Sequence, residues 1–472
     1  MATPGSVLWN ADAAAHLLRR AAFGGTPEEA REFASLGMEA AVERLLAFSK
    51  DEIAPPATDP GESATRARFR REKSKANGMA SEEEREFNRE QRRIFDDMRS
   101  WWMCRMHAGP PGAREKLTLF WHGHFATSQT KVRFNHIMLG QNQTLRRLAF
   151  APFRELCTAM ACDPAMLVWL DGRSNKASAP NENFAREVME LFALGEGHYS
   201  EEDIREAARA FTGWRVDPVN GRAVFTRRNF DGDTKKILGK QGNFGAEEAV
   251  DVICSRPACA EFLTAKIWEF YAGEPPNPTL ARMLASYYRA RDLNTGDLLR
   301  KMFSLPDFYS PSVRGRQIKS PVQWLVQASR ELGRQMLPPA LAIRLAANLG
   351  QDLFVPPSVK GWTGGPSWIN SATLIRRSNT ARIFAVAAPP LPRDGVDSMD
   401  AAAWSAVAPE ADRADAGRLA ARLQRVFLAG EPSPSTRHKL EAQLQKSSFP
   451  CSDETVREAS VVLLGVPEYQ LC

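Results

Sequence analysis

The sequence predicts a mainly α protein: a multi-helix domain with a small β-hairpin insertion and a C-terminal helical extension. Apolar residues recur at helical spacing along most of the 472-residue chain. Several of these stretches start at helix-capping residues, and only one stretch has the pattern of a hairpin. We therefore expect a helical core over residues 1–387 with the hairpin near 214–238, a linker at 388–400 and the extension at 401–472.

The N-terminal part begins with two amphipathic patterns. Residues 11–23 and 27–48 have the spacing of two helices joined by Gly24 and Gly25. Residues 51–78 are polar, of mixed charge, and contain prolines. This composition predicts an exposed insertion before the next helix.

A long helix and a shorter one follow the insertion. Ser81 and Glu84 have the spacing of a capping box, and a mostly apolar stripe continues from them to Trp102. Charged pairs cover the opposite face, which is typical of a solvated helix. The shorter pattern starts at Ala113 and stops near Gly123, because glycine disfavours a helix interior.

Further helices are predicted in the middle of the chain. Helical patterns cover residues 145–162 and 184–194, and Gly195 supplies the glycine that commonly follows a helix. Ser200 with Asp203 marks the start of another helix.

One stretch carries a β signal. Residues 214–217 and 223–227 have strand character and flank the turn dipeptide Asn220-Gly221, which predicts a hairpin. Residues 236–238 could add a third strand. After the hairpin the pattern is helical again to about residue 335, and the C-terminal part is helical again over about 415–466.

Composition and charge exclude several classes of protein. Apolar residues make up 43% and charged residues 25%, as in ordinary globular proteins, and the net charge is only +6. We expect no nucleic-acid partner, because acidic residues are mixed with the basic ones almost everywhere. The seven cysteines are irregularly spaced, which favours reduced thiols.

Targeting signals are not evident. Residues 1–25 lack an apolar core with a cleavage site, so we expect no signal peptide and a cytoplasmic location. No apolar run is long enough for a membrane span. The sequence also lacks the motifs of dinucleotide-binding folds, phosphate loops, zincins and α/β-hydrolases.

Two histidines are the candidate metal ligands. His122 and His124 lie among aromatic residues on either side of Gly123. On a helix, such positions face opposite sides, whereas in an extended segment they share a face and could bind one divalent metal ion. The alternative is that both imidazoles are packed core residues.

Charged residues follow Pro180 at helical spacing. Glu182, Arg186 and Glu190 stand four residues apart, and Glu187 lies one position beyond Arg186. Two carboxylates beside one arginine could hold different protonation states for acid–base catalysis. The alternative is a surface row of ion pairs that contributes little to stability.

The start of the same helix carries two asparagines. Asn181 or Asn183 can cap it by accepting hydrogen bonds from its first N–H groups. If the segment binds a substrate, both amides and the neighbouring Glu182 are candidate contacts.

The segment around the hairpin carries a further polar set. Arg205 and Arg209 stand one helical turn apart and could hold an anionic group, or could pair with neighbouring glutamates. Asp231 and Lys235 lie in a glycine-containing turn, where an aspartate more often caps the backbone than catalyses a reaction.

Six ordered motifs together resemble the bacterial domain of unknown function 1800 family, and the resemblance runs from about residue 10 to the C-terminus. The motifs are AAHLLRRAAFGGTPEEA at 14–30, FWHGHF at 120–125, NENFAREVMELFALG at 181–195, YSEEDIREAARAFTGW at 199–214, DGDTKKILG at 231–239, and VPPSVKGWTGGPSWIN at 355–370 with Arg376 and Arg377.

The resemblance implies a largely helical protein of uncharacterised activity. Relatives often carry export signals, so export is the alternative to a cytoplasmic location. They are often encoded beside a sulfatase-like family, the domain of unknown function 1501 family, which is therefore a candidate partner. Where relatives tend to have a His-Asp pair, this chain has Phe230 before Asp231, so Phe230 receives no role.

The expected function is a hydrolase or lyase that acts on a polymer or glycan, with metal assistance as an open question. The alternative is a non-catalytic scaffold or assembly partner whose motifs form a buried polar network. An open hollow between the histidine segment and the acid-rich helix would favour the enzyme. The assigned residues are, for catalysis, Glu187, Glu190 and Asp231; for substrate binding, Arg186, Arg209, Lys235, Asn181, Asn183 and Glu182; and for metal binding or proton transfer, His122 and His124.

Overall fold

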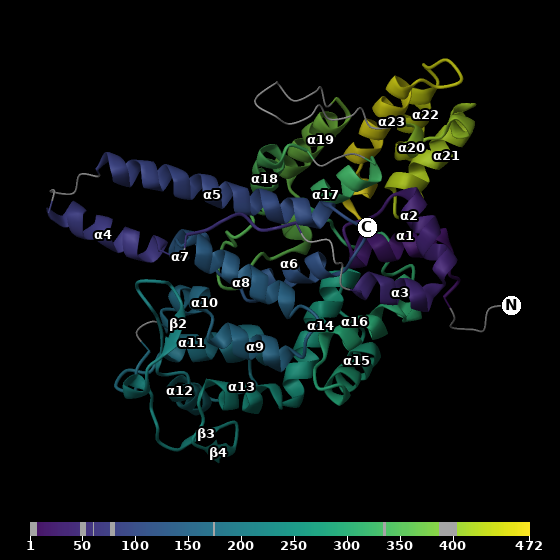
Figure 1. The fold of residues 1–472 in the computed structure, drawn as a ribbon. Helices are drawn as coiled ribbons and strands as arrows, with labels where there is room; N and C mark the ends of the chain where they lie inside the picture. The colour runs from purple at the N-terminus through teal and green to yellow at the C-terminus, as the bar shows by residue number, and fades with distance from the viewer. Residues whose placement is uncertain are drawn as a thin grey trace.

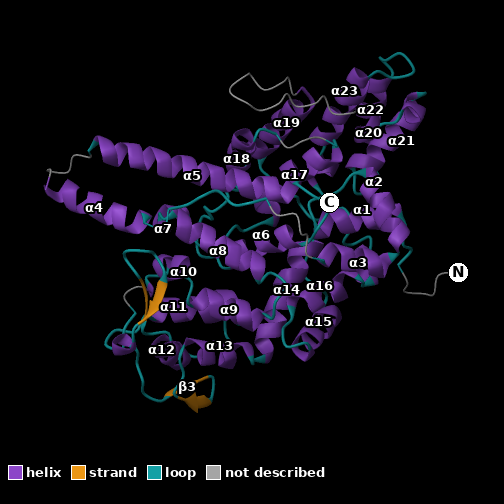
Figure 2. Ribbon diagram, viewed as in Figure 1, coloured by secondary structure: helices purple, strands orange, loops and turns teal. Residues whose placement is uncertain are grey.

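A computed structural model describes residues 7–47, 53–59, 61–75, 81–172, 175–333, 337–386 and 404–472. Helices dominate these ranges, and strands form two small antiparallel pairs (Figures 1 and 2). The predicted fold class, mainly α with a small hairpin insertion, is confirmed. The predicted linker at 388–400 lies outside the described residues. No helix in these ranges is long and apolar enough to cross a membrane.

The elements follow one another along the chain in three groups. The first group contains α1 Ala11–Ala21, α2 Pro27–Leu36, α3 Met38–Leu46, α4 Glu62–Lys75, α5 Glu82–His107, α6 Arg114–His124, α7 Gln129–Val132, α8 Asn135–Arg147, α9 Phe153–Ala161 and α10 Pro164–Trp169. The second contains α11 Glu182–Glu187, the π-helix η2 Val188–Ala193, α12 Glu201–Ala210, β1 Trp214–Val216, β2 Ala223–Phe225, η3 Arg227–Asn229, β3 Lys235–Ile237, β4 Lys240–Gly242, α13 Ala246–Cys254, α14 Pro257–Ala272, α15 Pro278–Ala290, α16 Thr295–Phe303 and η4 Pro306–Tyr309. The third contains α17 Pro321–Glu331, α18 Pro339–Asn348, η5 Gly365–Trp368, α19 Ser371–Val386, α20 Trp404–Val407, η6 Glu410–Arg413, α21 Ala416–Phe427, α22 Pro434–Leu444, α23 Asp453–Gly465 and η7 Pro467–Gln470.

Two apolar cores hold these helices together. The first joins α1–α3 to α9 and α11–α16, and Trp268 is among its buried residues. The second joins α5 to α17–α23, and it contains the buried Trp324 and Tyr469. Helix α6 contributes Trp121 to the first core and Leu119 to the second. The histidine segment therefore lies on the helix that runs between the two cores.

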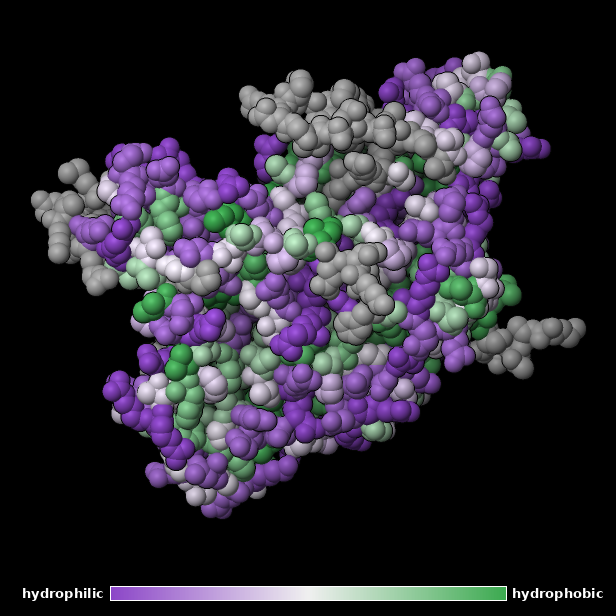
Figure 3. All heavy atoms as spheres, viewed as in Figure 1, coloured by the Kyte–Doolittle hydropathy of each residue, from purple (hydrophilic) through white to green (hydrophobic). Residues whose placement is uncertain are grey.

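Helices α4 and α5 form an arm that extends from the body (Figure 1). Phe69 and Phe87 pack together with ring centroids 5.5 Å apart, and Arg68 pairs with Glu83. Hydrophilic residues cover much of the arm in the face shown by Figure 3. The predicted insertion at 51–78 thus contains a helix in its described part, and this helix forms one side of the arm.

Two predicted helices are each divided in two, and the single-helix prediction is wrong at both places. The pattern at 27–48 is interrupted at Gly37, whose φ of +80° is unfavourable for other residues. The pattern at 145–162 is interrupted after α8, where Pro152 precedes α9 and the Phe153 N–H donates to the Leu293 carbonyl. A distant segment therefore satisfies the backbone at the second break.

The predicted hairpin is confirmed, with one change. Strands β1 and β2 pair in antiparallel register with Trp214 opposite Phe225. Gly221 in the turn has a φ of +68°, which the predicted Asn-Gly turn requires. The third strand does not join this sheet, because β3 pairs with β4 in a second hairpin that packs against α12.

Candidate functional site

Helix α6 continues through both candidate metal ligands, so the extended geometry that a shared metal site would require is not formed. Gly123 stays helical and lies beside the loop that follows α18. A Cβ atom on Gly361 of this loop would lie 2.1 Å from the Gly123 carbonyl oxygen. The close approach of the loop therefore requires glycine at 361, whereas a Cβ atom on Gly123 would make only an ordinary contact with Trp362.

His122 is enclosed by aromatic side chains. It is 1% exposed and contacts Trp102, Phe354 and Trp362, with ring centroids 5.2–5.7 Å away. Neither ring nitrogen has a hydrogen-bond partner within the described residues. Burial lowers the pKa of His122 to about 3, so the imidazole is neutral at physiological pH.

His124 has a different environment and a defined donor. Its Nε2 lies 2.9 Å from the Phe192 carbonyl oxygen, at the end of the π-helix η2. A carbonyl oxygen can only accept, so Nε2 carries the hydrogen and Nδ1 keeps its lone pair. Nδ1 has no partner in the described structure. Burial lowers the pKa of His124 well below its usual value, so the ring acts as a neutral hydrogen-bonding group.

The two histidines do not fit a shared metal site. They lie on one helix, two residues apart, and their rings enter separate aromatic surroundings. The described parts of the chain contain no group of three or more His, Cys, Asp or Glu side chains placed to hold a metal ion.

A hollow of about 530 Å³ lies between η2, α14 and the loop after α18. His124 and Glu190 both line it, so the structure brings together the histidine segment and the acid-rich helix. His122 is not part of this lining. Lys266 and Lys360 contribute cationic groups to the same hollow.

Glu190 is one of three glutamates that line the hollow, with Glu196 and Glu261. Residues 188–193 form a π-helix, a local widening of the helix that is frequent at functional sites. The Tyr199 hydroxyl donates to Glu190 Oε2 at 2.8 Å. This hydrogen bond fixes the carboxylate and leaves acceptor positions for a ligand.

Glu187 precedes Glu190 by one turn and is half-buried. It forms no hydrogen bond or ion pair with another described residue. Burial and the charge of Glu190 raise the pKa of Glu187, while the positive charge of Lys360 opposes this effect. The two carboxyl groups thus differ in environment: Glu190 is fixed by a tyrosine, and Glu187 more readily holds a proton.

The two lysines of the hollow have no carboxylate partner. Neither Lys266 nor Lys360 makes a side-chain hydrogen bond or ion pair in the ranges that the structure describes. Burial lowers the pKa of Lys266 to about 8, and its Nζ lies 4.9 Å from the centre of the Phe262 ring. These amines are available to a negatively charged ligand.

Arg186 does not take the place predicted for it between Glu182 and Glu190. Its guanidinium forms two hydrogen bonds of 2.8 and 2.7 Å to Glu201 at the start of α12. This partner raises the pKa of Arg186. Glu182 and Asn183 are exposed. The predicted row of charges along one helix is therefore replaced by a pair between two helices.

Asn181 caps α11, and it is one of the two asparagines for which the sequence predicted this role. Its Oδ1 accepts from the N–H groups of Asn183 and Phe184. Its Nδ2 donates to the Leu170 carbonyl. Both ends of the amide are therefore used in positioning the acid-rich helix.

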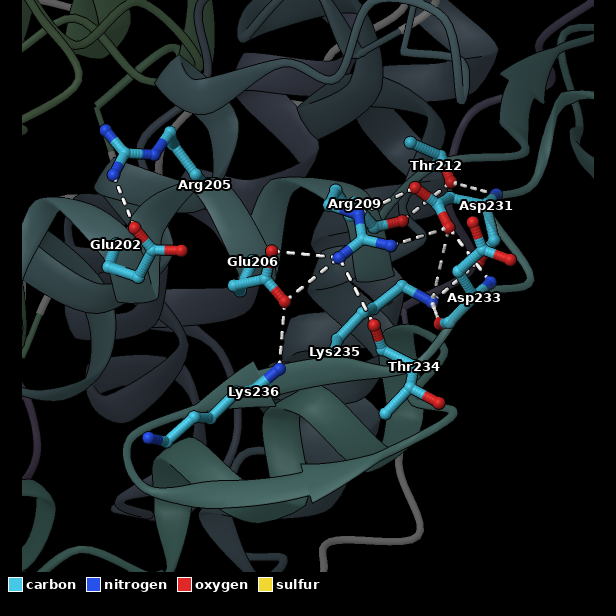
Figure 4. Close-up of polar contacts among 10 residues, drawn as sticks. All are labelled: Glu202, Arg205, Glu206, Arg209, Thr212, Asp231, Asp233, Thr234, Lys235 and Lys236. Atoms are coloured by element: carbon cyan, nitrogen blue, oxygen red, sulfur yellow. Dashed lines mark hydrogen bonds and ion pairs between the residues drawn. The ribbon is translucent and has the colours of Figure 1, made fainter.

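Arg209, Asp231 and Lys235 come together in a separate cluster between α12 and β3 (Figure 4). Arg209 binds both oxygens of Asp231, at 2.7 and 3.2 Å, and also pairs with Glu206 at 2.9 Å. The Arg209 guanidinium lowers the pKa of Asp231. The Asp231 N–H donates to Thr212, so the aspartate is held through its backbone as well.

Lys235 is buried beneath this cluster. Its Nζ donates to the carbonyls of Asp231 and Asp233, at 2.6 and 2.9 Å. It also lies 4.9 Å from the centre of the Phe230 ring. Phe230, where relatives tend to have histidine, thus contacts the ammonium through its ring face. Neither Asp231 nor Lys235 lines the hollow beside Glu190.

Several residues of the hollow had no role in the sequence analysis. Lys360 lies within a motif that carried the resemblance, and Tyr199 opens another. Lys266 stands in a mostly apolar helix, α14, between Glu261 and Glu269, where a single lysine is a weak signal. A second hollow of about 270 Å³ continues the site, because His124, Lys266 and Lys360 line both.

Comparison with known proteins supports one assignment. The sequence pattern of the family described as "Protein of unknown function (DUF1800)" matches residues 16–471. No curated protein and no solved structure matches the chain. Since the match covers nearly all of the sequence, the chain belongs to the DUF1800 family.

Proposed function

We propose that this protein is an enzyme, a hydrolase or lyase that cleaves a polymer or glycan by carboxylate acid–base chemistry. One observation carries the proposal: a glutamate, a histidine and two lysines that form no ion pair in the described structure line the same hollow, namely Glu190, His124, Lys266 and Lys360. Carboxylate, imidazole and ammonium groups that converge on a hollow point to a ligand or substrate there.

The two glutamates supply the proton transfers in this proposal. Glu187 does not line the hollow, but it lies one turn before Glu190, and burial and Glu190 raise its pKa. We assign it the donation of a proton to the leaving-group oxygen. Glu190, held by Tyr199, accepts a proton from water in a hydrolase or from carbon in a lyase. Positioned proton transfer of this kind accelerates reactions by about 10²–10⁴-fold.

Lys266 and Lys360 bind negative charge on the substrate in this proposal. The sequence assigned that task to Arg186 and Arg209, but both guanidinium groups are already engaged by carboxylates. His124 is neutral, and its Nε2 hydrogen bond to the Phe192 carbonyl holds η2 against α6 at the edge of the hollow. No metal ion is needed for these steps.

The test is a screen of the purified protein on neutral, uronate-containing and sulfated polymers. New reducing ends without unsaturation indicate a hydrolase, and ultraviolet absorbance of an unsaturated product indicates a lyase. Glu190→Gln and Glu187→Gln should each lower turnover by about 100-fold or more. Glu182→Gln is the matched control, since it lies exposed on the same helix. Full turnover in both site variants would contradict the proposal.

A non-catalytic scaffold is the second candidate. The cluster of Arg209, Asp231 and Lys235 favours it for that part of the chain, because its charges are bound by protein groups. The scaffold predicts no activity on any polymer, together with loss of folding in the Glu187 and Glu190 variants. Activity that disappears while the fold remains would exclude it.

The partner is predicted from the family resemblance, and the cellular location is predicted from the sequence. We propose the sulfatase-like domain of unknown function 1501 protein as the partner, and its copurification with this chain tests this. A cytoplasmic location, with export as the alternative, is decided by fractionation of the native host. A gel shift tests the predicted lack of nucleic-acid binding.

A further inference from the structure

The second hollow ends at an unpaired buried amine. Lys116 of α6 lines the hollow and is only 1% exposed. Its Nζ has no hydrogen-bond partner in the described part of the chain. The faces of Phe23 and Phe270 lie 5.2 and 5.9 Å from this Nζ. An ammonium group normally donates three hydrogen bonds, so this environment is incomplete.

Two further cations lie behind Lys116. The Nε and Nη1 atoms of Arg20 and the Nζ of Lys319 are also buried without hydrogen-bond partners in the described structure. Lys319 Nζ lies 3.4 Å from the centre of the Tyr469 ring. Burial, with the charges of Arg20 and Lys319, lowers the pKa of Lys116 to about 7. The interior at this point therefore has an excess of positive charge.

The neighbouring groups offset this charge only in part, through Glu331 and Cys472. The carboxylate of Glu331 already accepts from Arg19, Gln327 and Tyr469. Glu269 lines the same hollow but is exposed to solvent. Cys472 favours the charged form of Lys116, and its thiol is engaged with glutamine side chains. An uncompensated charge in a protein interior is costly, and a bound anion removes this cost.

We propose that the inner end of this hollow binds the carboxylate or sulfate group of an acidic sugar, with Lys116 as its direct contact. The walls of the hollow suit the rest of such a ligand. Trp362 and Phe120 offer ring faces to the apolar side of a sugar, and Gln351 offers a polar group to its hydroxyls.

The anion site itself does not depend on the proposed function. The inference rests on the proposed function only where it takes the bound acidic sugar to be the substrate. Both hollows share His124, Lys266 and Lys360. An acidic chain that occupies both would place one unit at Lys116 and the next near Glu190. The substrate class is therefore an acidic glycan, and the inner hollow selects its negatively charged units.

Binding of small probes tests the inference without turnover. Titration calorimetry on the full chain would use glucuronate, inorganic sulfate and, as the neutral comparison, glucose. The wild type should bind glucuronate or sulfate more tightly than glucose, and the better anion identifies which acidic group the site takes. Lys116→Met should lower the affinity for that anion by about ten-fold or more.

The control is Lys240→Met, because Lys240 is exposed and remote from the hollow lining. Lys116→Gln provides a second variant should the methionine disturb the fold, and thermal unfolding confirms that each variant is folded. Absence of anion binding in the wild type, or equal anion affinity in Lys116→Met and wild type, would overturn the inference. Glu190→Gln distinguishes this inference from the catalytic proposal. If the variant still binds the anion but has lost turnover, the anion site is supported, whereas the catalytic proposal is tested only by the turnover measurement.

Discussion

Two polar regions of this molecule differ in how their charges are satisfied. In the cluster between α12 and β3, Arg209 binds Asp231 and Glu206, and Lys235 donates to backbone carbonyls. Beside the hollows next to α6, by contrast, the buried amine of Lys116 has no acceptor among the described residues. The charged residues of the cluster lie within motifs that carry the family resemblance, whereas Lys116 lies outside them.

The comparison separates residues that hold the fold from residues that await a ligand. A charged group with protein partners stabilises the structure, and its removal leaves those partners unpaired. A charged group without partners costs stability and is explained by what it binds. Stability measurements can therefore distinguish the two regions before any substrate is known.

The largest effect is expected in the cluster. Arg209→Met should lower the free energy of unfolding by about 2–4 kcal/mol, because it leaves the Asp231 and Glu206 carboxylates without their cation. Chemical denaturation measures this change. A loss below about 0.5 kcal/mol, the size typical of surface substitutions, would remove the contrast between the two regions.

At the inner hollow, removal of the charged group should raise the free energy of unfolding rather than lower it. The pKa of Lys116 is lowered to about 7 in the folded protein, whereas an unfolded lysine titrates near 10.4. Between these values the unfolded state binds more protons, so the stability due to this group rises with pH by up to about 1.4 kcal/mol per pH unit.

Lys116→Met should therefore be more stable than the wild type at pH 7 and should show a smaller rise between pH 7 and 10. Some rise remains, because burial also lowers the pKa of Lys319, to about 8. Denaturation at several pH values measures both features. An unchanged pH dependence would show that Lys116 is not an uncompensated buried cation.

The smallest effect concerns the cap of the acid-rich helix. Asn181→Ala should lower stability by about 1 kcal/mol, since Asn181 accepts from two N–H groups at the start of α11. Asn183→Ala is the matched control, because Asn183 is exposed. Equal effects of the two substitutions would argue against a capping role.

Much of the fold could be predicted from local sequence. Helical spacing and capping residues such as Ser81 and Ser200 identified helices that the structure contains. The errors arose where contacts between distant segments determine where a helix ends. The end of α8 depends on Leu293, which accepts from the start of α9, and helix α6 passes Gly123 because Gly361 packs against it.

The site could be predicted only in part. The proximity of the histidine segment to the acid-rich helix was expected, and His124 and Glu190 do share a hollow. The roles of Lys116 and Lys266 were not foreseen, because a sequence does not show which lysines lack a partner. Spacing likewise suggested Glu190 as a partner for Arg186, whereas the packing of α12 against α11 brings Glu201 to it.

The most direct test is a matched pair of amide substitutions, Glu187→Gln and Asp231→Asn, compared by their free energies of unfolding at pH 7. Each replaces one carboxylate by a neutral group of nearly the same size. We predict that Asp231→Asn is destabilised by about 2 kcal/mol or more, because Arg209 loses one of its two charged partners and keeps only Glu206. Glu187→Gln should equal or exceed the wild type in stability, because burial and Glu190 disfavour its charge. Equal destabilisation of both variants would contradict the division between a structural cluster and a ligand-binding hollow.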